Sequence, residues 1–211
     1  MKYYKLTDKL NKDEIVMKDK DYSYRYYFGA EKWVKTGTML KYQYPDDELF
    51  GEYTEVPEEE AKQLMDIQRE NLNKLYALAR NIAEEAHKGQ FDKGGKPYIN
   101  HPVAVADLLE STEHKIVALL HDILEDTEVT AEQLKTYGFT DRIIKSIRML
   151  TKDDSTGYEE YLQYIKTDYN AWMVKMADLK HNMDISRIPE PTEKDFERIE
   201  KYKKALEFLE S

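Results

Sequence analysis

Apolar residues recur at every third or fourth position through most of the chain, the spacing that places them on one face of an α-helix. The first such segment covers residues 57–87 and opens with Pro57, which suits the first turn of a helix. The glutamates after Pro57 complement the positive end of the helix dipole. The pattern predicts one long helix here, with an apolar face formed by Leu64, Ile67, Leu72, Leu75, Leu78 and Ile82.

Shorter segments with helical spacing fill the rest of the chain. Thr130 and Thr192 are suitable N-cap residues, and Gly138 is a suitable residue to end a helix. Further helices are predicted to begin near Pro102 and to cover residues 115–126, 130–138, 141–150, 157–166, 171–183 and 192–210.

The first 55 residues have a different pattern. Aromatic and β-branched residues alternate roughly with polar ones in 22–29 and 31–44, and turn-forming residues surround these segments. We predict three or four short antiparallel strands. The predicted fold class is therefore mainly α, with a small tyrosine-rich antiparallel β region over 1–55 and a helical domain over 56–211.

The composition is typical of a soluble globular protein, since 35% of the 211 residues are charged and 41% are hydrophobic. The formal net charge of −10 argues against a binder of nucleic-acid polymers or anionic membranes, because such surfaces need a basic excess. A phosphorylated small molecule stays open as a partner if lysines or a metal ion gather locally. The oligomeric state does not follow from the sequence.

The absence of cysteine excludes disulfides and thiolate metal sites, so any metal ion must bind His, Asp or Glu. The N-terminus lacks the apolar core of a signal peptide, and no stretch approaches the length of an apolar membrane span. The expected location is the cytoplasm.

Four ionisable residues follow an apolar run in "VALLHDILEDTEVT", residues 117–130. On a helix, His121 lies on the same face as Glu125, and Asp122 lies on the same face as Asp126. His121 and Asp122 lie about 100° apart, so both can reach one ion placed between them. Imidazole and carboxylate suit Mn, Fe, Zn or Mg. The alternative is an exposed acidic helix end beside a core histidine.

A second segment, residues 83–109, places His101 directly before Pro102, where the next helix is expected to begin. Lys93 and Lys96 flank Gly94 and Gly95 in a basic loop that could approach a phosphate. The alternative is a solvated turn with a capping histidine.

A third segment, "WMVKMADLKHNMD" (172–184), carries Asp178 on a predicted helix. Asn182 lies one turn later on the same face, and Lys175 lies three residues earlier. The alternative is an ordinary helix carboxylate paired with Lys175.

The three segments together resemble the HD metal-dependent phosphohydrolase superfamily. The similarity is closest to the hydrolase domain of the RelA/SpoT family and to the small alarmone hydrolases. It covers about residues 75–190, and residues 1–55 have no counterpart in it. The resemblance implies an HD-domain helical bundle around one metal ion, usually Mn²⁺. It is carried by "AHKGQ" (86–90), "KPYINHPVAVADLL" (96–109), "ALLHDILEDTEVT" (118–130), "MLTK" (149–152) and "VKMADLKHNM" (174–183).

The resemblance also implies roles for individual residues. The ligands of Mn²⁺, or of another divalent metal ion, would be His101, His121, Asp122 and Asp178. Glu125 and Asp126 would be the catalytic pair that orients or deprotonates water. Substrate would contact Lys93, Asn182, Lys88, Lys175 and Tyr98, although Tyr98 suits a core position equally well.

The implied reaction is the removal of the 3′-diphosphate of guanosine tetraphosphate (ppGpp) or pentaphosphate as pyrophosphate. One position departs from the family, because Asp92 stands where an arginine stacks on guanine. Two alternatives therefore stay open. The first is an HD phosphatase for another nucleotide or phosphorylated metabolite. The second is a non-enzymatic metal-binding module whose aromatic N-terminal region, with Tyr24, Tyr26, Tyr27 and Trp33, recognises a partner.

Overall fold

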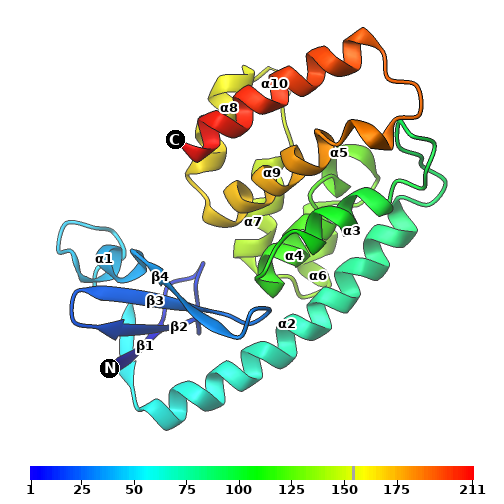
Figure 1. The fold of residues 1–211 in the computed structure, drawn as a ribbon. Helices are drawn as coiled ribbons and strands as arrows, with labels where there is room; N and C mark the ends of the chain where they lie inside the picture. Colours follow the sequence, from blue (N-terminus) through cyan, green and yellow to red (C-terminus); the bar gives the residue numbers. More distant parts are fainter. Residues whose placement is uncertain (154) are drawn as a thin grey trace. The chain divides into compact units, whose positions relative to one another are not determined.

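Antiparallel strands form the start of the chain in the computed structural model, which describes residues 1–153 and 155–211. The sheet has five strands in the order β4-β3-β2-β1-β5, and every neighbouring pair is antiparallel. The sheet belongs to the first of two compact units, Met1–Lys74 and Leu75–Ser211. The strands, drawn in blue and cyan in Figure 1, are β1 Lys2–Leu6, β2 Ile15–Asp19, β3 Tyr22–Tyr27, β4 Lys32–Thr36 and β5 Tyr53–Val56.

The prediction of three or four strands was too low, and part of one predicted strand is helical. Within 31–44, only Lys32–Thr36 is a strand, and Thr38–Gln43 forms helix α1. Met39 and Tyr42 are its buried residues, three positions apart, so they share one helix face. Both pack in an apolar cluster with residues of β1 and β2, and this packing favours the helix over the strand pattern.

The aromatic residues of the β region pack against one another. Tyr26 and Trp33 lie on paired strands with ring centroids 5.2 Å apart, and Tyr3 lies 6.1 Å from Trp33. These rings cover a cluster formed by Ile15, Val56, Ala61 and Met65. Their positions are thus explained by packing within the unit Met1–Lys74. The domain boundary after residue 55 stays a prediction, and the last strand ends beside it.

The remaining helices confirm the mainly α fold class. None in the described part of the chain has the length and apolar character needed to cross a membrane. The helices are α2 Glu58–Ala86, α3 Asn100–Asp107, α4 Thr112–Leu119, α5 Ile123–Asp126, α6 Ala131–Thr136, α7 Asp141–Leu150, α8 Tyr158–Lys166, α9 Tyr169–Asn182 and α10 Glu193–Glu210, with a 3₁₀ turn η1 at Ile185–Arg187.

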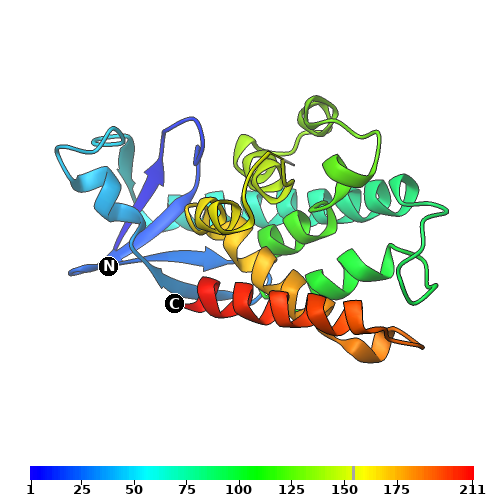
Figure 2. The ribbon, with the colours of Figure 1, turned by 90° about the horizontal axis from the view of Figure 1, so that it is seen from above.

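Helix α9 is the centre of the second unit. It contacts α3, α4, α7, α8 and α10, and Figures 1 and 2 show α10 lying along it. Its buried residues include Val174, Ala177 and Leu179. A side chain on this helix is therefore held by neighbours on several sides, which suits the placement of a reactive group.

The predicted helix over 115–126 is interrupted. Helix α4 ends at Leu119, a turn covers 120–122, and α5 begins at Ile123. The His121 imidazole donates from Nδ1 to the carbonyl of Ala118, 2.7 Å away, near the end of α4. Leu119, Leu120 and Ile123 stay buried on both sides of the turn. The interruption keeps the apolar side chains in the core while it redirects His121 and Asp122.

Thr130 caps α6 as predicted. Its side chain accepts a hydrogen bond from the backbone of Gln133, whose side chain accepts one from the Thr130 backbone. We expect Thr130→Ala to lower the free energy of unfolding by about 1 kcal/mol, because one backbone donor loses its partner. Urea denaturation measures this, with Thr136→Ala in the same helix as the control. Equal losses in the two variants would contradict the assignment.

Candidate metal centre

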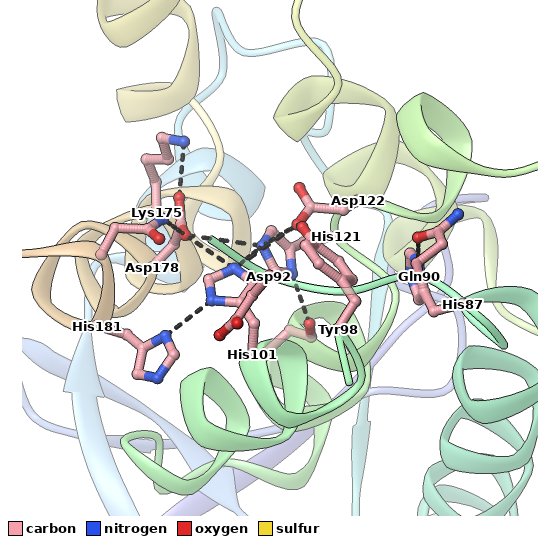
Figure 3. A network of polar contacts seen from close by, with 12 residues as sticks. His87, Gln90, Asp92, Tyr98, His101, His121, Asp122, Lys175, Asp178 and His181 are labelled. Atoms are coloured by element: carbon pink, nitrogen blue, oxygen red, sulfur yellow. Dashed lines mark hydrogen bonds and ion pairs between the residues drawn. The ribbon is translucent and has the colours of Figure 1, made fainter. Parts of the chain in front are cut away.

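Three separate elements bring the predicted ligands together, as Figure 3 shows. His101 lies in the first turn of α3, His121 and Asp122 in the turn between α4 and α5, and Asp178 on α9. His101, His121 and Asp178 are buried, and Asp122 is partly buried. Burial of this many ionisable groups is costly unless they are paired or bind an ion.

The distances between these residues fit a shared ion. The two imidazole Nε2 atoms of His101 and His121 lie 3.3 Å apart. The Asp178 Oδ1 atom lies 3.3 Å from the first of them and 3.8 Å from the second. The Asp122 Oδ2 atom lies 3.0 Å from His121 Nε2 and 3.6 Å from His101 Nε2. Ligands about 2.1 Å from one ion lie about 3.0 to 3.4 Å from one another. Three of the five distances lie in this range and the other two are 0.2 to 0.4 Å longer, so small shifts would let the donor set bind one divalent cation.

One ligand atom from each of His101, His121 and Asp178 lies within 4.8 Å of the other two, so these residues could hold a metal ion together. Asp122 adds a fourth candidate ligand beside them, through its Oδ2 atom. Nδ1 of His121 must carry a proton, because its partner, the Ala118 carbonyl, can only accept. In neutral His121, Nε2 is therefore the nitrogen with a free lone pair.

The electrostatics of the cluster favour a positive charge at its centre. Burial opposes charge on His121, but Asp122 and Asp178 raise its pKa to about 10. Burial also opposes the charge on Asp122, yet His121 lowers its pKa to about 2. The two carboxylates thus stabilise a positive charge among these atoms, which can be either a proton or a metal cation.

Asp178 is fixed by two neighbours on its own helix. Lys175 Nζ lies 2.8 Å from Oδ2, and Asn182 Nδ2 donates to Oδ1 at 2.5 Å. Burial opposes ionisation, but Lys175 holds the pKa of the Asp178 carboxyl well below its usual value. Lys175 and Asn182 therefore hold the Asp178 carboxylate in place, and both also line the cleft described next.

A cleft of about 630 Å³ opens at this cluster. His101, Asp122 and Asp178 line it, together with Glu125 and Asp126. Its volume lies in the range of sites for small ligands. The cationic side chains on its walls are Lys93, Lys152, Lys175, Arg187, Arg198 and Lys201.

Glu125 and Asp126 lie on α5, one turn after Asp122. The backbone N–H of Lys152 donates to Glu125 Oε2 at 3.4 Å. Partial loss of hydration raises the pKa of both carboxyls, and the nearby Asp122 charge raises it further. Carboxylates with raised pKa values at the edge of such a cleft are suited to accept a proton.

Two of the remaining predicted substrate residues line the cleft, and one does not. The Tyr98 hydroxyl donates to Asp122, and its ring packs against His87 and His101, so it combines a packing role with an orienting one. Lys93 lines the cleft, with its Nζ 3.9 Å from Asp195. Lys88 is exposed, pairs with Glu85, and is not among the residues that line the cleft.

The sequence reasoning missed His181 and Arg187. His181 Nδ1 lies 2.8 Å from His101 Nδ1 and 3.0 Å from Nη1 of Arg187, which also pairs with Asp92 at 2.9 Å. His181 could have been found, because it is three residues after Asp178. No local signal marked Arg187.

The chain belongs to the HD domain family, whose model matches residues 79–198, more than half of the chain. This confirms the resemblance inferred from the three segments. A solved structure described as "A metazoan ortholog of SpoT hydrolyzes ppGpp and plays a role in starvation responses" is similar with a TM-score of 0.52 and 21% identity. The similarity covers 64% of this chain and 84% of that one, and it supports the shared fold.

Curated relatives carry the names of alarmone enzymes. A guanosine-3′,5′-bis(diphosphate) 3′-pyrophosphohydrolase of Haemophilus influenzae is 37% identical over 48% of this chain and 17% of its own length. The bifunctional (p)ppGpp synthase/hydrolase SpoT of Escherichia coli K12 is 31% identical over 48% of this chain and 16% of its own length. A guanosine-3′,5′-bis(diphosphate) 3′-pyrophosphohydrolase MESH1 of Danio rerio is 34% identical over 58% of this chain and 74% of its own length. The chain thus spans a small part of the first two relatives and most of the third.

Proposed function

We propose that this protein is a metal-dependent phosphohydrolase that removes pyrophosphate from the 3′ position of guanosine 3′,5′-bis(diphosphate). One observation carries the proposal. The side-chain nitrogen and oxygen atoms of His101, His121, Asp122 and Asp178 lie 3.0 to 3.6 Å from one another in the cited pairs, where one cleft opens. The names of the relatives support the substrate class. We propose Mn²⁺ as the ion and the cytoplasm as the location.

The ion would supply positive charge against phosphate oxygens and would make a water molecule more acidic. The residues of the chain supply the rest. Glu125 or Asp126 accepts the proton of the attacking water, and the Lys152 backbone N–H fixes the Glu125 carboxylate for that task. Water adds to the phosphorus that is bonded to the ribose 3′-oxygen, and the bond between that phosphorus and the 3′-oxygen breaks. The 3′-oxygen takes up a proton from solvent to become a hydroxyl, and the pyrophosphate, which now carries the oxygen of the water, is released.

The walls of the cleft support a nucleotide substrate. Although the whole chain carries a net charge of −10, Lys93, Lys152, Arg198 and Lys201 all line this one cleft. Cationic side chains can neutralise phosphate groups beyond the reach of the ion. Phe91, Tyr158 and Tyr202 line the same cleft and provide aromatic faces for a base or sugar.

A hydrolysis screen with product identification tests the proposal. The protein is stripped with EDTA, and turnover is measured with and without added Mn²⁺ on guanosine 3′,5′-bis(diphosphate), GTP, ATP, GDP and p-nitrophenyl phosphate. We expect no turnover without metal and restoration by Mn²⁺, because solvent is a weak nucleophile without the ion. Pyrophosphate release from guanosine 3′,5′-bis(diphosphate) is the expected product signal.

The other outcomes separate the alternatives. Release of orthophosphate from a different substrate would favour a phosphatase on the same fold. Bound metal without turnover of any compound would contradict the enzymatic proposal and favour a metal-binding module. Turnover that EDTA does not change would contradict the metal centre itself.

A further inference from the structure

A chain of polar contacts leads from the loop after α2 to the candidate ligand His101. Asp92 Oδ2 accepts a hydrogen bond from Arg187 Nη2 at 2.9 Å. Arg187 Nη1 lies 3.0 Å from His181 Nδ1, and that same nitrogen lies 2.8 Å from Nδ1 of His101. Figure 3 shows the last of these contacts, between His181 and His101. None of these residues except His101 was a predicted ligand.

The chemistry of the donors fixes the direction of these contacts. A guanidinium can only donate, so Nδ1 of His181 acts as an acceptor towards Arg187. An accepting Nδ1 carries no proton, and the proton between the two imidazoles must therefore lie on Nδ1 of His101. In neutral His101 this leaves Nε2, the atom that faces His121 and Asp178, with its lone pair free.

Asp92, at the other end of this series of polar contacts, is firmly held. The Asp92 side chain is only 9% exposed, and its Oδ1 accepts from the backbone N–H groups of Gly94 and Lys96, both at 2.9 Å. Gly94 lies so close to the Arg187 backbone that a Cβ there would overlap the Arg187 carbonyl oxygen. The loop that carries Asp92 thus packs closely against η1. The contacts of Asp92 with the loop backbone and with Arg187 explain why an aspartate suits this position.

We infer that Asp92, Arg187 and His181 are positioning residues for His101. Arg187 makes His181 an acceptor, and His181 then holds the His101 proton on Nδ1 and presents Nε2 to the ion. Outer partners of this kind fix the tautomer and ring orientation of a ligating histidine, and their loss typically lowers metal affinity about 10-fold to 100-fold. The inference rests on the proposed function, because it requires His101 to bind the metal.

The test measures Mn²⁺ binding and the His101 tautomer. We expect Arg187→Met to raise the dissociation constant for Mn²⁺ by at least about 10-fold. In the metal-free protein, ¹⁵N NMR is expected to show a protonated Nδ1 on His101, and Arg187→Met is expected to produce exchange between the two tautomers. The matched control is Arg80→Met, which breaks the Arg80–Glu84 pair on the exposed face of α2 and is expected to change neither signal.

A double variant guards against misfolding, since Arg187→Met leaves the buried Asp92 unpaired. Asp92→Asn combined with Arg187→Met removes that charge and is expected to show the same weakened Mn²⁺ binding. A His101 that carries its proton only on Nε2 in the unaltered protein would overturn the inference. So would Mn²⁺ binding within twofold of the parent in the double variant. An unaltered protein that binds no divalent metal would instead refute the proposed metal centre.

Discussion

Asp122→Ala is expected to lose both bound Mn²⁺ and catalysis. The substitution removes the oxygen that lies 3.0 Å from His121 Nε2 and 3.6 Å from His101 Nε2. Loss of an outer partner already costs about 10-fold to 100-fold in affinity, so loss of a ligand should cost at least about 100-fold. Because the ion contributes several kcal/mol to the transition state, turnover should fall by more than about 1,000-fold.

Metal analysis after dialysis and steady-state turnover measure the two effects. Asp66→Ala is the matched control, since it removes an exposed carboxylate that pairs with Arg69 at 2.5 Å in the unit Met1–Lys74. Unchanged thermal unfolding of Asp122→Ala would show that the loss is local. A variant that keeps full metal content and full turnover would refute Asp122 as a ligand.

Glu125→Gln is expected to separate metal binding from catalysis. Glu125 lines the same cleft as His101, Asp122 and Asp178, and its carboxylate accepts a hydrogen bond from the Lys152 backbone N–H. Glutamine keeps the shape but cannot take up a proton at neutral pH. Turnover should therefore fall by about 100-fold to 10,000-fold, the usual effect of losing a general base, while metal content stays constant.

Glu128→Gln provides the comparison on the same segment, because Glu128 is not among the residues that line the cleft. Asp126→Asn shows which member of the acidic pair takes the proton. If only Asp126→Asn slows turnover, Asp126 is the base and the role proposed for Glu125 is wrong. If Glu125→Gln loses its metal, Glu125 acts in metal binding instead.

Most of the helices could be predicted from local patterns in the sequence. The apolar spacing in 57–87 and 141–150 corresponds to α2 and α7, and Thr130 caps α6 as predicted. These features depend on residues within one or two turns of each other, so the chain alone contains the information. The residue types in the three segments likewise identified the HD domain family.

Packing between distant residues overruled the local pattern in two places. The segment around Met39 alternates like a strand, but burial of Met39 and Tyr42 against the sheet makes it helical. The helix predicted over 115–126 breaks before His121, because a turn there keeps Leu120 and Ile123 in the core while His121 reaches the Ala118 carbonyl. Neither outcome can be read from neighbours in sequence alone.

The contacts of Asp92 show most clearly what could not be predicted from the sequence alone. By itself, Asp92 is a departure from the family arginine. In the fold it pairs with Arg187, 95 residues away, and through His181 it reaches His101. Sequence determined which ionisable groups were present and which helices carried them, since both follow from short-range chemistry. Only the tertiary structure decided which of them share a proton, because that depends on distances set by the packing of α3, α9 and η1.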